Sequence, residues 1–198
     1  MQITKPALSS TPLLEAIALR WSGRAFDPRK PVAEEDLRAL LEAARWSPSS
    51  MNAQPWRFVT MDRQHPSSAW QVALETLAPS NQIWAREAPL LLAVLAETRL
   101  PNGDTNRWAE FDTGAALMAL SIEASHRGLM IHPMGGFDSL KLRTGLKLPE
   151  SWTPLCIAAI GHQLPRTEIP ESLLDRELSE RIRNPLESIW FDPDRLNF

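Results

Sequence analysis

The chain has 198 residues, of which 43% are hydrophobic and 23% are charged, and its mass is 22.3 kDa. This composition predicts one globular domain over residues 1–198 and excludes a disordered or repeat protein. The net charge of −3 and the isoelectric point near 5.8 argue against a nucleic-acid-binding protein, which usually carries a basic balance.

The chain has one cysteine, Cys156, which excludes an intramolecular disulfide framework and any zinc or iron–sulfur site built from several cysteines. The first residues, Met1–Pro6, lack the apolar stretch of a signal peptide. The longest apolar run, Ala88–Ala96, is shorter than the ~20 residues that span a bilayer. We therefore expect a soluble, cytoplasmic protein.

The first half of the chain reads as alternating helices and short extended pieces. Thr11 before Pro12 predicts an N-cap and a helix over residues 13–19. A second helix starts at the acidic residues 34–36 and ends before Pro48, since its apolar residues recur with helical spacing. A strand is expected over residues 57–60, and a third helix over residues 68–77, which Pro79 ends.

The second half adds two buried strands, over residues 90–95 and 155–160, because each is a short continuous apolar run. Between them lies the longest helix, residues 108–127, closed by Gly128 as a C′ glycine. This helix is apolar on two faces, so we expect it inside the domain or at a subunit contact. A short extended piece (residues 130–132) and a helix over 139–144 capped by Asp138 follow the longest helix. The mixture predicts an α+β fold, with helices around a sheet.

Residues 165–198 form a charged, proline-punctuated tail. It carries apolar residues without a core of its own: Leu173, Leu174, Leu178, Ile189, Trp190, Phe191 and Phe198. Such residues need a surface to cover. We favour an arm that reaches a second subunit over a local wrap on the same chain.

Three clusters have the chemistry to hold an anion or a ring. Arg20, Ser22 and Arg24 alternate, so that two guanidiniums and a hydroxyl can converge on a phosphate. The alternative is a solvated helix end. The loop Ser47–Trp56 is dense in short donors and acceptors that suit the polar edge of a heterocycle, although a plain turn can contain them. In Pro133–Phe137 the paired glycines allow backbone amides to approach a ligand closely, although such a pair is more often only a turn.

Other chemistries find less support. The four histidines share no metal-ligand spacing, so we expect no metal site. The serines lack a Gly-x-Ser-x-Gly elbow, and the glycine pair is no dinucleotide-binding fingerprint. Cys156 is interpreted as core filler. For His132, pocket contact and a structural role stay open, and Trp84 and Trp108 are candidates to line a ring, although packing explains most of the tryptophans.

Together these clusters resemble the FMN-dependent nitroreductase family of NAD(P)H-dependent flavin oxidoreductases. The resemblance runs from about Leu14 to Ile189, and five motifs carry it in family order: Arg20-x-Ser22-x-Arg24, Ser47-Pro48-Ser49-Ser50-x-Asn52-x-Gln54-Pro55-Trp56, Glu110-Phe111-Asp112-Thr113-Gly114, Pro133-Met134-Gly135-Gly136-Phe137-Asp138 and Arg181-x-Arg183-x-Pro185-Leu186.

The resemblance implies a central, mostly antiparallel sheet flanked by helices, in a homodimer whose C-terminal extension wraps the partner subunit. One FMN would lie at each of two interface sites. Arg20, Ser22 and Arg24 would approach its phosphate and the N1/O2 edge, and Arg181 and Arg183 would complete phosphate binding. The other residues implied to bind the cofactor are Pro48, Ser49, Ser50 and Asn52 from the other subunit, Asn81 near the ring's polar edge, and Gly135 and Gly136 near N5 and O4.

The implied activity is hydride transfer from NAD(P)H through FMN to a small acceptor, such as a nitroaromatic, a quinone, an enal or an aldehyde. This chemistry needs no catalytic side chain, since the flavin N5 carries it. Two alternatives stay open. One is a flavin-binding or storage protein without turnover, and the other is a flavin-based dehalogenase or flavin-cleaving relative. Either way, we expect no nucleic-acid or membrane partner.

Overall fold

The structure is a computed structural model that describes residues 2–65 and 67–192. Within these residues, four strands form one antiparallel sheet in the order β1-β2-β4-β3. Their bounds are Trp56–Asp62 for β1, Leu90–Glu97 for β2, Met130–Met134 for β3 and Trp152–Gly161 for β4. The predicted α+β class and antiparallel sheet are confirmed, and each predicted extended piece is part of a longer strand.

Strand β2 lies in the interior of the sheet and contributes to two hydrophobic cores. Successive side chains of a strand point to opposite faces. Leu91, Ala93 and Leu95 accordingly lie in one core and Leu90, Leu92 and Val94 in the other. All six are buried, which explains why this strand reads as an unbroken apolar run without polar alternation.

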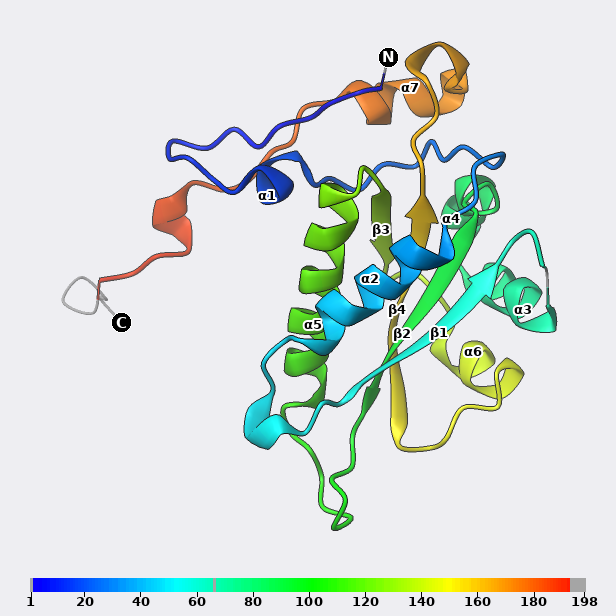
Figure 1. Cartoon of the computed structure of the whole chain (residues 1–198), viewed down its shortest axis with the longest axis vertical. Coiled ribbons are helices and arrows are strands. Elements are labelled where there is room, and N and C mark those ends of the chain that lie inside the picture. The colour runs from blue at the N-terminus through cyan, green and yellow to red at the C-terminus, as the bar shows by residue number, and fades with distance from the viewer. Residues whose placement is uncertain (1, 66, 193–198) are drawn as a thin grey trace.

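Helices cover both faces of the sheet (Figure 1). On one face lie α3 (Ser68–Thr76), α4 (Pro79–Ala85) and α6 (Ser139–Gly145), and on the other lie α2 (Glu34–Arg45) and α5 (Ala109–His126). Helix α5 buries Ala116, Leu120 and Ala124 against the sheet, while Phe111 and Met118 on its other side are exposed. The two apolar faces predicted for this helix thus have different surroundings.

Two of the three predicted helix caps are confirmed. Gly128 follows α5 with φ of +71°, and the amides of Gly128 and Leu129 donate to the carbonyls of Ser125 and Ala124, which closes the helix in a Schellman motif. The Asp138 side chain accepts from the Lys141 amide at 3.0 Å and caps α6.

The cap predicted at Thr11 is wrong. Helix α1 (Glu15–Leu19) starts two residues later than predicted, with Leu14 at the N-cap position and no side-chain cap hydrogen bond. The Leu14 carbonyl accepts from Ile17 and Ala18 and closes the first turn. The segment before Leu14 instead runs alongside α1, where the Ala7 amide donates to the Ala18 carbonyl at 2.8 Å.

Sequence reading missed two helices. Pro79, interpreted as the end of the third helix, is the first residue of α4, because proline is well tolerated where the amide has no helical partner. Helix α7 (Glu171–Leu178) lies within the segment interpreted as irregular tail. Short 3-10 turns complete the structure: η1 (Ser50–Asn52), η2 (Arg166–Glu168) and η3 (Leu186–Ser188).

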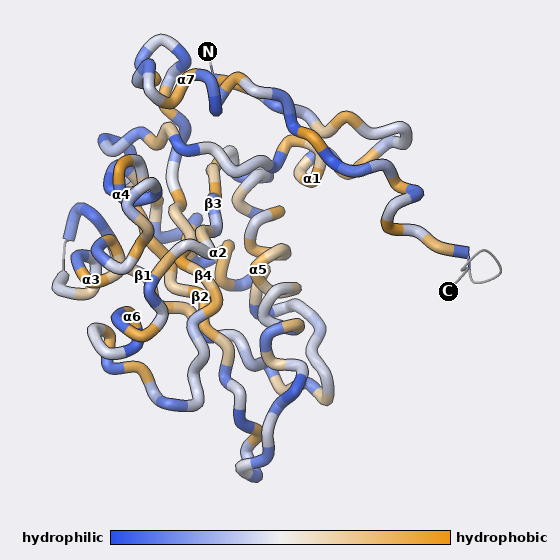
Figure 2. Tube along the Cα trace, turned by 180° about the vertical axis from the view of Figure 1, so that it is seen from behind, coloured by the Kyte–Doolittle hydropathy of each residue, from blue (hydrophilic) through white to orange (hydrophobic). Residues whose placement is uncertain are grey.

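After α7 the chain leaves the sheet and runs outward beyond α1 (Figure 1). Leu186, Ile189, Trp190 and Phe191 are exposed there, and Figure 2 shows hydrophobic stretches along this tail. Residues 193–198, and with them Phe198, lie outside the described residues. An arm that wraps a partner stays a prediction. No helix among the described residues is long and apolar enough to cross a membrane.

Candidate functional site

Arg20, Arg181 and Arg183 lie close to one another, although 161 and 163 residues separate Arg20 from the other two. Burial lowers the pKa of Arg20, and the positive charges of Arg181 and Arg183 lower it further. Within the described residues, none of the three forms an ion pair with a carboxylate. Three like charges gathered without a counter-charge favour the binding of an anion between them.

Backbone contacts hold this cluster in place. The Arg181 side chain donates to the carbonyls of Lys5 and Ala18, at 2.8 and 2.5 Å. Arg20 donates to the Ser22 hydroxyl at 3.4 Å. Arg181 and Arg183 also line a groove of about 590 Å³ between the N-terminal segment and the tail, together with the hydroxyl-bearing residues Ser9, Ser10 and Thr11. Guanidinium and hydroxyl donors of this kind suit a phosphate group.

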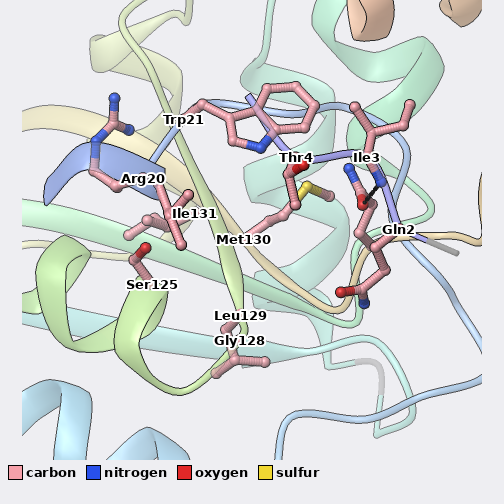
Figure 3. Close-up of a pocket in the computed structure, with 12 residues that line it drawn as sticks. Gln2, Ile3, Thr4, Arg20, Trp21, Ser125, Gly128, Leu129, Met130 and Ile131 are labelled. Atoms are coloured by element: carbon pink, nitrogen blue, oxygen red, sulfur yellow. Dashed lines mark hydrogen bonds between the residues drawn. The ribbon is translucent and has the colours of Figure 1, made fainter. Parts of the chain in front are cut away.

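A separate, smaller cavity of about 120 Å³ lies beside Arg20, Trp21 and Met130 (Figure 3). In this view the Arg20 guanidinium points away from the other labelled side chains. The buried amide nitrogen of Gln163, which also lines the cavity, has no hydrogen-bond partner among the described residues. Because its guanidinium points away from the other lining residues, Arg20 directs its charge out of this cavity.

Arg24 lies beside a second group of residues. Its guanidinium is 5.9 Å from the ring centre of Trp84, and the Trp84 ring lies 4.6 Å from that of His132. Trp84 is only 3% exposed and also stacks on Phe26, so it is a core residue that supports Arg24 and His132. His132 lies on β3, and its Nδ1 is 3.0 Å from the Gly23 carbonyl, which is a structural contact; a contact of His132 with a pocket stays a prediction.

Asn81 and the glycine pair lie next to this group. Asn81 is one turn before Trp84 on α4, and its side-chain nitrogen is 3.5 Å from the Gly136 carbonyl. A Cβ at Gly135 would meet no described atom of this chain within 4 Å, so the chain leaves space for a ligand beside the Gly135 backbone. The structure thus brings together Asn81, Gly136 and, through Trp84, Arg24.

The loop residues Pro48, Ser49, Ser50 and Asn52 lie elsewhere, at the start of α5. The Ser50 amide donates to the Asp112 carboxylate at 3.0 Å, and the Ser49 hydroxyl accepts from the Gln54 amide at 3.0 Å. Met51, Asn52 and Gln54 have φ of 53°, 55° and 48°, in the left-handed region that side chains other than asparagine rarely adopt. Such strained backbone persists where surrounding contacts hold it, and it clusters at functional sites.

Arg20 and the loop that contains Ser50 lie at opposite ends of α5. Arg20 shares the small cavity with Ser125 in the last turn of α5, whereas Ser50 is bound to Asp112 in the first turn. With a rise of ~1.5 Å per residue, these two turns are ~20 Å apart. Within one chain, one small group such as a phosphate therefore cannot contact both ends.

Two buried carboxylates, those of Asp112 and Glu177, bind backbone amides of the candidate site, and the sequence assigned neither of them a role. Asp112 stood inside a motif, but nothing in its spacing links it to Ser50. Glu177 is fully buried on α7 and accepts from the Arg24 amide at 2.8 Å. A glutamate in a charged tail carries no signal of burial, so only the folded chain reveals this contact.

Cys156 is buried on β4, and burial raises the pKa of its thiol to about 12, which confirms its interpretation as core filler. Trp108 is 43% exposed and meets the exposed Phe111 edge-on, with ring centres 6.1 Å apart. This exposed aromatic pair lies at the same end of α5 as the Ser50 loop, whereas Trp84 lies at the Arg24 group.

Comparison with known proteins finds the same fold in solved structures. A solved structure described as an oxidoreductase containing FMN is 33% identical, covers 98% of both chains and superposes with a TM-score of 0.85. A nitroreductase family protein from Clostridium difficile 630 has the same fold, with a TM-score of 0.70, 24% identity and coverage of 92% of this chain and 99% of that chain. The major NAD(P)H-flavin oxidoreductase of Aliivibrio fischeri is 41% identical over 64 residues, which are 29% of each chain.

The family model described as the nitroreductase family matches residues 17–162, which include Arg20, Ser22 and Arg24, the Ser47–Trp56 loop and the glycine pair. The match covers most of the chain and includes all four strands of the sheet, whereas Arg181 and Arg183 lie beyond its end. This chain belongs to the nitroreductase family.

Proposed function

We propose that this protein is an FMN-dependent oxidoreductase that uses NAD(P)H to reduce a small acceptor, such as a nitroaromatic, a quinone, an enal or an aldehyde. The observation that carries the proposal is the cluster of Arg20, Arg181 and Arg183, whose charges oppose one another without a carboxylate partner among the described residues. A phosphate monoester carries a charge of about −2 near neutral pH and would relieve this repulsion.

The donor set fits FMN at both of its ends. The arginine cluster and nearby hydroxyl groups suit the phosphate, and Arg24, which lies over Trp84, would supply a positive charge to the flavin ring. Open space at Gly135 leaves backbone there accessible to a flat ring, and Asn81 offers an amide beside it. When bound, FMN supplies the hydride chemistry, which the side chains of this site need not perform.

The residues of this chain then have binding and electrostatic roles. Arg20, Arg181 and Arg183 would hold the phosphate, and Ser22 would add a hydroxyl donor. Arg24 would stabilise negative charge that accumulates on the ring edge beside it, because an opposite charge at short range in a partly buried site interacts strongly. NAD(P)H and the acceptor would enter in turn over the open face of the ring.

We also propose that the functional unit is a homodimer in which the partner supplies the Pro48–Asn52 loop. The loop lies ~20 Å along α5 from Arg20 within one chain. Exposed apolar residues lie where a second subunit could cover them, on α5 and on the tail: Phe111, Met118, Leu186, Ile189, Trp190 and Phe191. Patches of this kind typically mark protein–protein contacts. The tail would then act as the arm that wraps the partner.

The proposal is tested by the colour and redox behaviour of the purified protein. We expect a yellow protein that NADH or NADPH bleaches without oxygen and that menadione or nitrofurazone reoxidises. Yellow protein that neither nucleotide bleaches would indicate a flavin-binding protein without turnover, and a colourless protein that refuses added FMN would overturn the proposal.

A matched pair of variants tests the phosphate site. Arg20→Ala should weaken FMN binding by tenfold or more, about the loss of one charge-assisted contact. Arg38→Ala is the control, since Arg38 is an exposed arginine on α2 that pairs with Glu34. Equal FMN affinity in the two variants would contradict the assignment of Arg20.

A further inference from the structure

The peptide unit between Gly23 and Arg24 is held on both sides by side chains from distant parts of the chain. Its carbonyl, that of Gly23, is 3.0 Å from Nδ1 of His132 on β3. Its N–H, that of Arg24, donates to Oε1 of Glu177 on α7 at 2.8 Å. In a trans peptide these groups point in opposite directions, so the two bonds grip the same rigid plane from opposite sides.

The proton on His132 is assigned by this geometry. The Gly23 carbonyl can only accept, so Nδ1 must carry the proton. Burial lowers the pKa of His132 to about 4, and the neighbouring charges of Arg24 and Arg20 also lower it. The imidazole is therefore neutral near pH 7, with Nδ1–H as a donor to the peptide, and its ring is held against Trp84.

Glu177 binds the main chain of Arg24 and leaves the guanidinium free. The carboxylate is fully buried, and its other oxygen, Oε2, has no hydrogen-bond partner among the described residues. Burial raises the pKa of Glu177, and the charge of Arg24 partly offsets this, but the two side chains form no ion pair within 4.0 Å in the described part of the chain. The Arg24 guanidinium lies over Trp84 instead, where its charge stays available to an anion.

Close packing around Gly23 makes this arrangement specific. A Cβ there would lie 2.4 Å from the Met130 sulfur, 3.0 Å from the Trp21 ring and 3.2 Å from Oε2 of Glu177. Only glycine lets the peptide approach β3 and α7 this closely. The peptide therefore has little freedom to shift, and the backbone position from which the Arg24 side chain starts is fixed.

We propose that His132 and Glu177 are positioning residues that orient Arg24 for the bound cofactor by gripping the Gly23–Arg24 peptide. This inference rests on the proposed function, since the anion that Arg24 meets is FMN. It gives α7 a role beyond packing, because this helix connects the tail to the cofactor site through Glu177. Neither residue needs to touch the cofactor.

Two pairs of variants separate the grip from general packing. Glu177→Met keeps the length and burial of the side chain but removes its acceptors, whereas Glu177→Gln keeps an acceptor oxygen. His132→Phe keeps a ring on Trp84 but removes the donor, whereas His132→Asn keeps a donor near the position of Nδ1. FMN dissociation constants come from quenching of flavin fluorescence, and exchange of the Arg24 amide is followed by hydrogen–deuterium exchange.

We expect Glu177→Met and His132→Phe to weaken FMN binding about tenfold each, and the Gln and Asn variants to stay within about threefold of the natural chain. In an Arg24→Ala background, Glu177→Met should weaken binding no further, because its effect acts through Arg24. Exchange of the Arg24 amide should speed up in Glu177→Met and not in Glu177→Gln.

The outcomes distinguish this inference from the proposed function. A natural chain that binds no FMN overturns the proposed function, and amide exchange still tests the grip. A natural chain that binds FMN, with affinity unchanged in Glu177→Met and His132→Phe, overturns the grip alone. Equal losses in the natural and Arg24→Ala backgrounds would also overturn it, since they indicate general destabilisation. If Glu177→Met does not fold, His132→Phe in both backgrounds gives the same test.

Discussion

The carboxylate of Asp112 accepts a hydrogen bond from the backbone amide of Ser50 at 3.0 Å, across 62 residues of sequence. Asp112 is 5% exposed and lies in the first turn of α5, where the helix dipole stabilises a negative charge. Through this contact the first turn of α5 fixes the loop that carries Pro48, Ser49 and Asn52. Helix α5 thus holds in place the Pro48–Asn52 loop, which is the loop half of the candidate site; Arg20, Arg181 and Arg183 form its arginine half.

Removal of this carboxylate should loosen the loop. Asp112→Ala leaves the Ser50 amide without its partner, so we expect a loss of about 1–3 kcal/mol in the free energy of unfolding and weaker FMN binding. Asp112→Asn keeps an acceptor and should lose less of both. Urea unfolding and FMN titration measure the two effects, and equal behaviour of the Ala and Asn variants would contradict the role of this hydrogen bond.

Arg24 should set the reduction potential of the bound flavin. Without its charge, negative charge on the ring edge is less stabilised, so Arg24→Ala should lower the two-electron potential by on the order of 30 mV or more, equivalent to about 1.4 kcal/mol. Arg24→Lys keeps the charge and should retain part of the effect. Anaerobic titration against a redox dye gives the potentials, and an unchanged value in Arg24→Ala refutes this role.

His132 should make the folded state less stable in mild acid. Its pKa is about 4 in the folded chain and near 6.5 when unfolded, so between these values the unfolded chain binds more protons. Stability from this residue is therefore complete above pH 6.5 and is lost as the pH falls toward 4, by up to about 1.4 kcal/mol per pH unit.

The control for this pH dependence is His132→Asn, which keeps a donor but does not titrate in this range. Urea unfolding of both proteins from pH 4 to 8 should show a steeper pH profile for the natural chain below pH 6.5, and a constant difference above it. Parallel profiles over the whole range would show that His132 is protonated equally in both states.

Cys156 should be inert in the folded protein. Burial raises the pKa of its thiol to about 12, and the thiolate is the reactive form. At pH 8 we expect the folded chain to react with a disulfide reagent far more slowly than the same chain in denaturant, where the thiol is exposed. Comparable rates in the two conditions would show that β4 opens readily around this residue.

Features set by neighbouring residues could be predicted from the sequence. The buried run of β2, the Schellman glycine Gly128 and the Asp138 cap depend on contacts within a few residues, so local patterns indicate them correctly. Of the three alternating residues predicted to converge, Arg20 and Ser22 lie within hydrogen-bond distance, whereas the Arg24 guanidinium lies over Trp84. The error at Thr11 is also local: Pro12 can start a helix, but here the chain bends at Ser10 and Thr11, and α1 begins only at Glu15.

Features set by contacts between distant residues could not be predicted. Glu177 and Arg24 are 153 residues apart, and no pattern in either segment indicates that the Glu177 carboxylate is buried against the Arg24 amide. Helix α7 itself is short, and its sequence resembles a solvated tail until its buried contacts are known. The separation of Ser50 and Arg20 at opposite ends of α5 agrees with the resemblance, which implied that the loop comes from the other subunit, but no local pattern in either segment indicates it.

The central claim is that each cofactor site combines the arginine half of one chain with the loop half of another, and mixing of two defective variants tests it most directly. Arg20→Glu disables the arginine half, and Ser50→Trp blocks the loop half. Each variant alone should bind no FMN. After they are unfolded together and refolded, half of the dimers are mixed and one of two sites in each is intact, so about a quarter of the natural FMN content should return. No recovery from mixed dimers that fold correctly, or normal FMN binding by Ser50→Trp alone, would contradict the account.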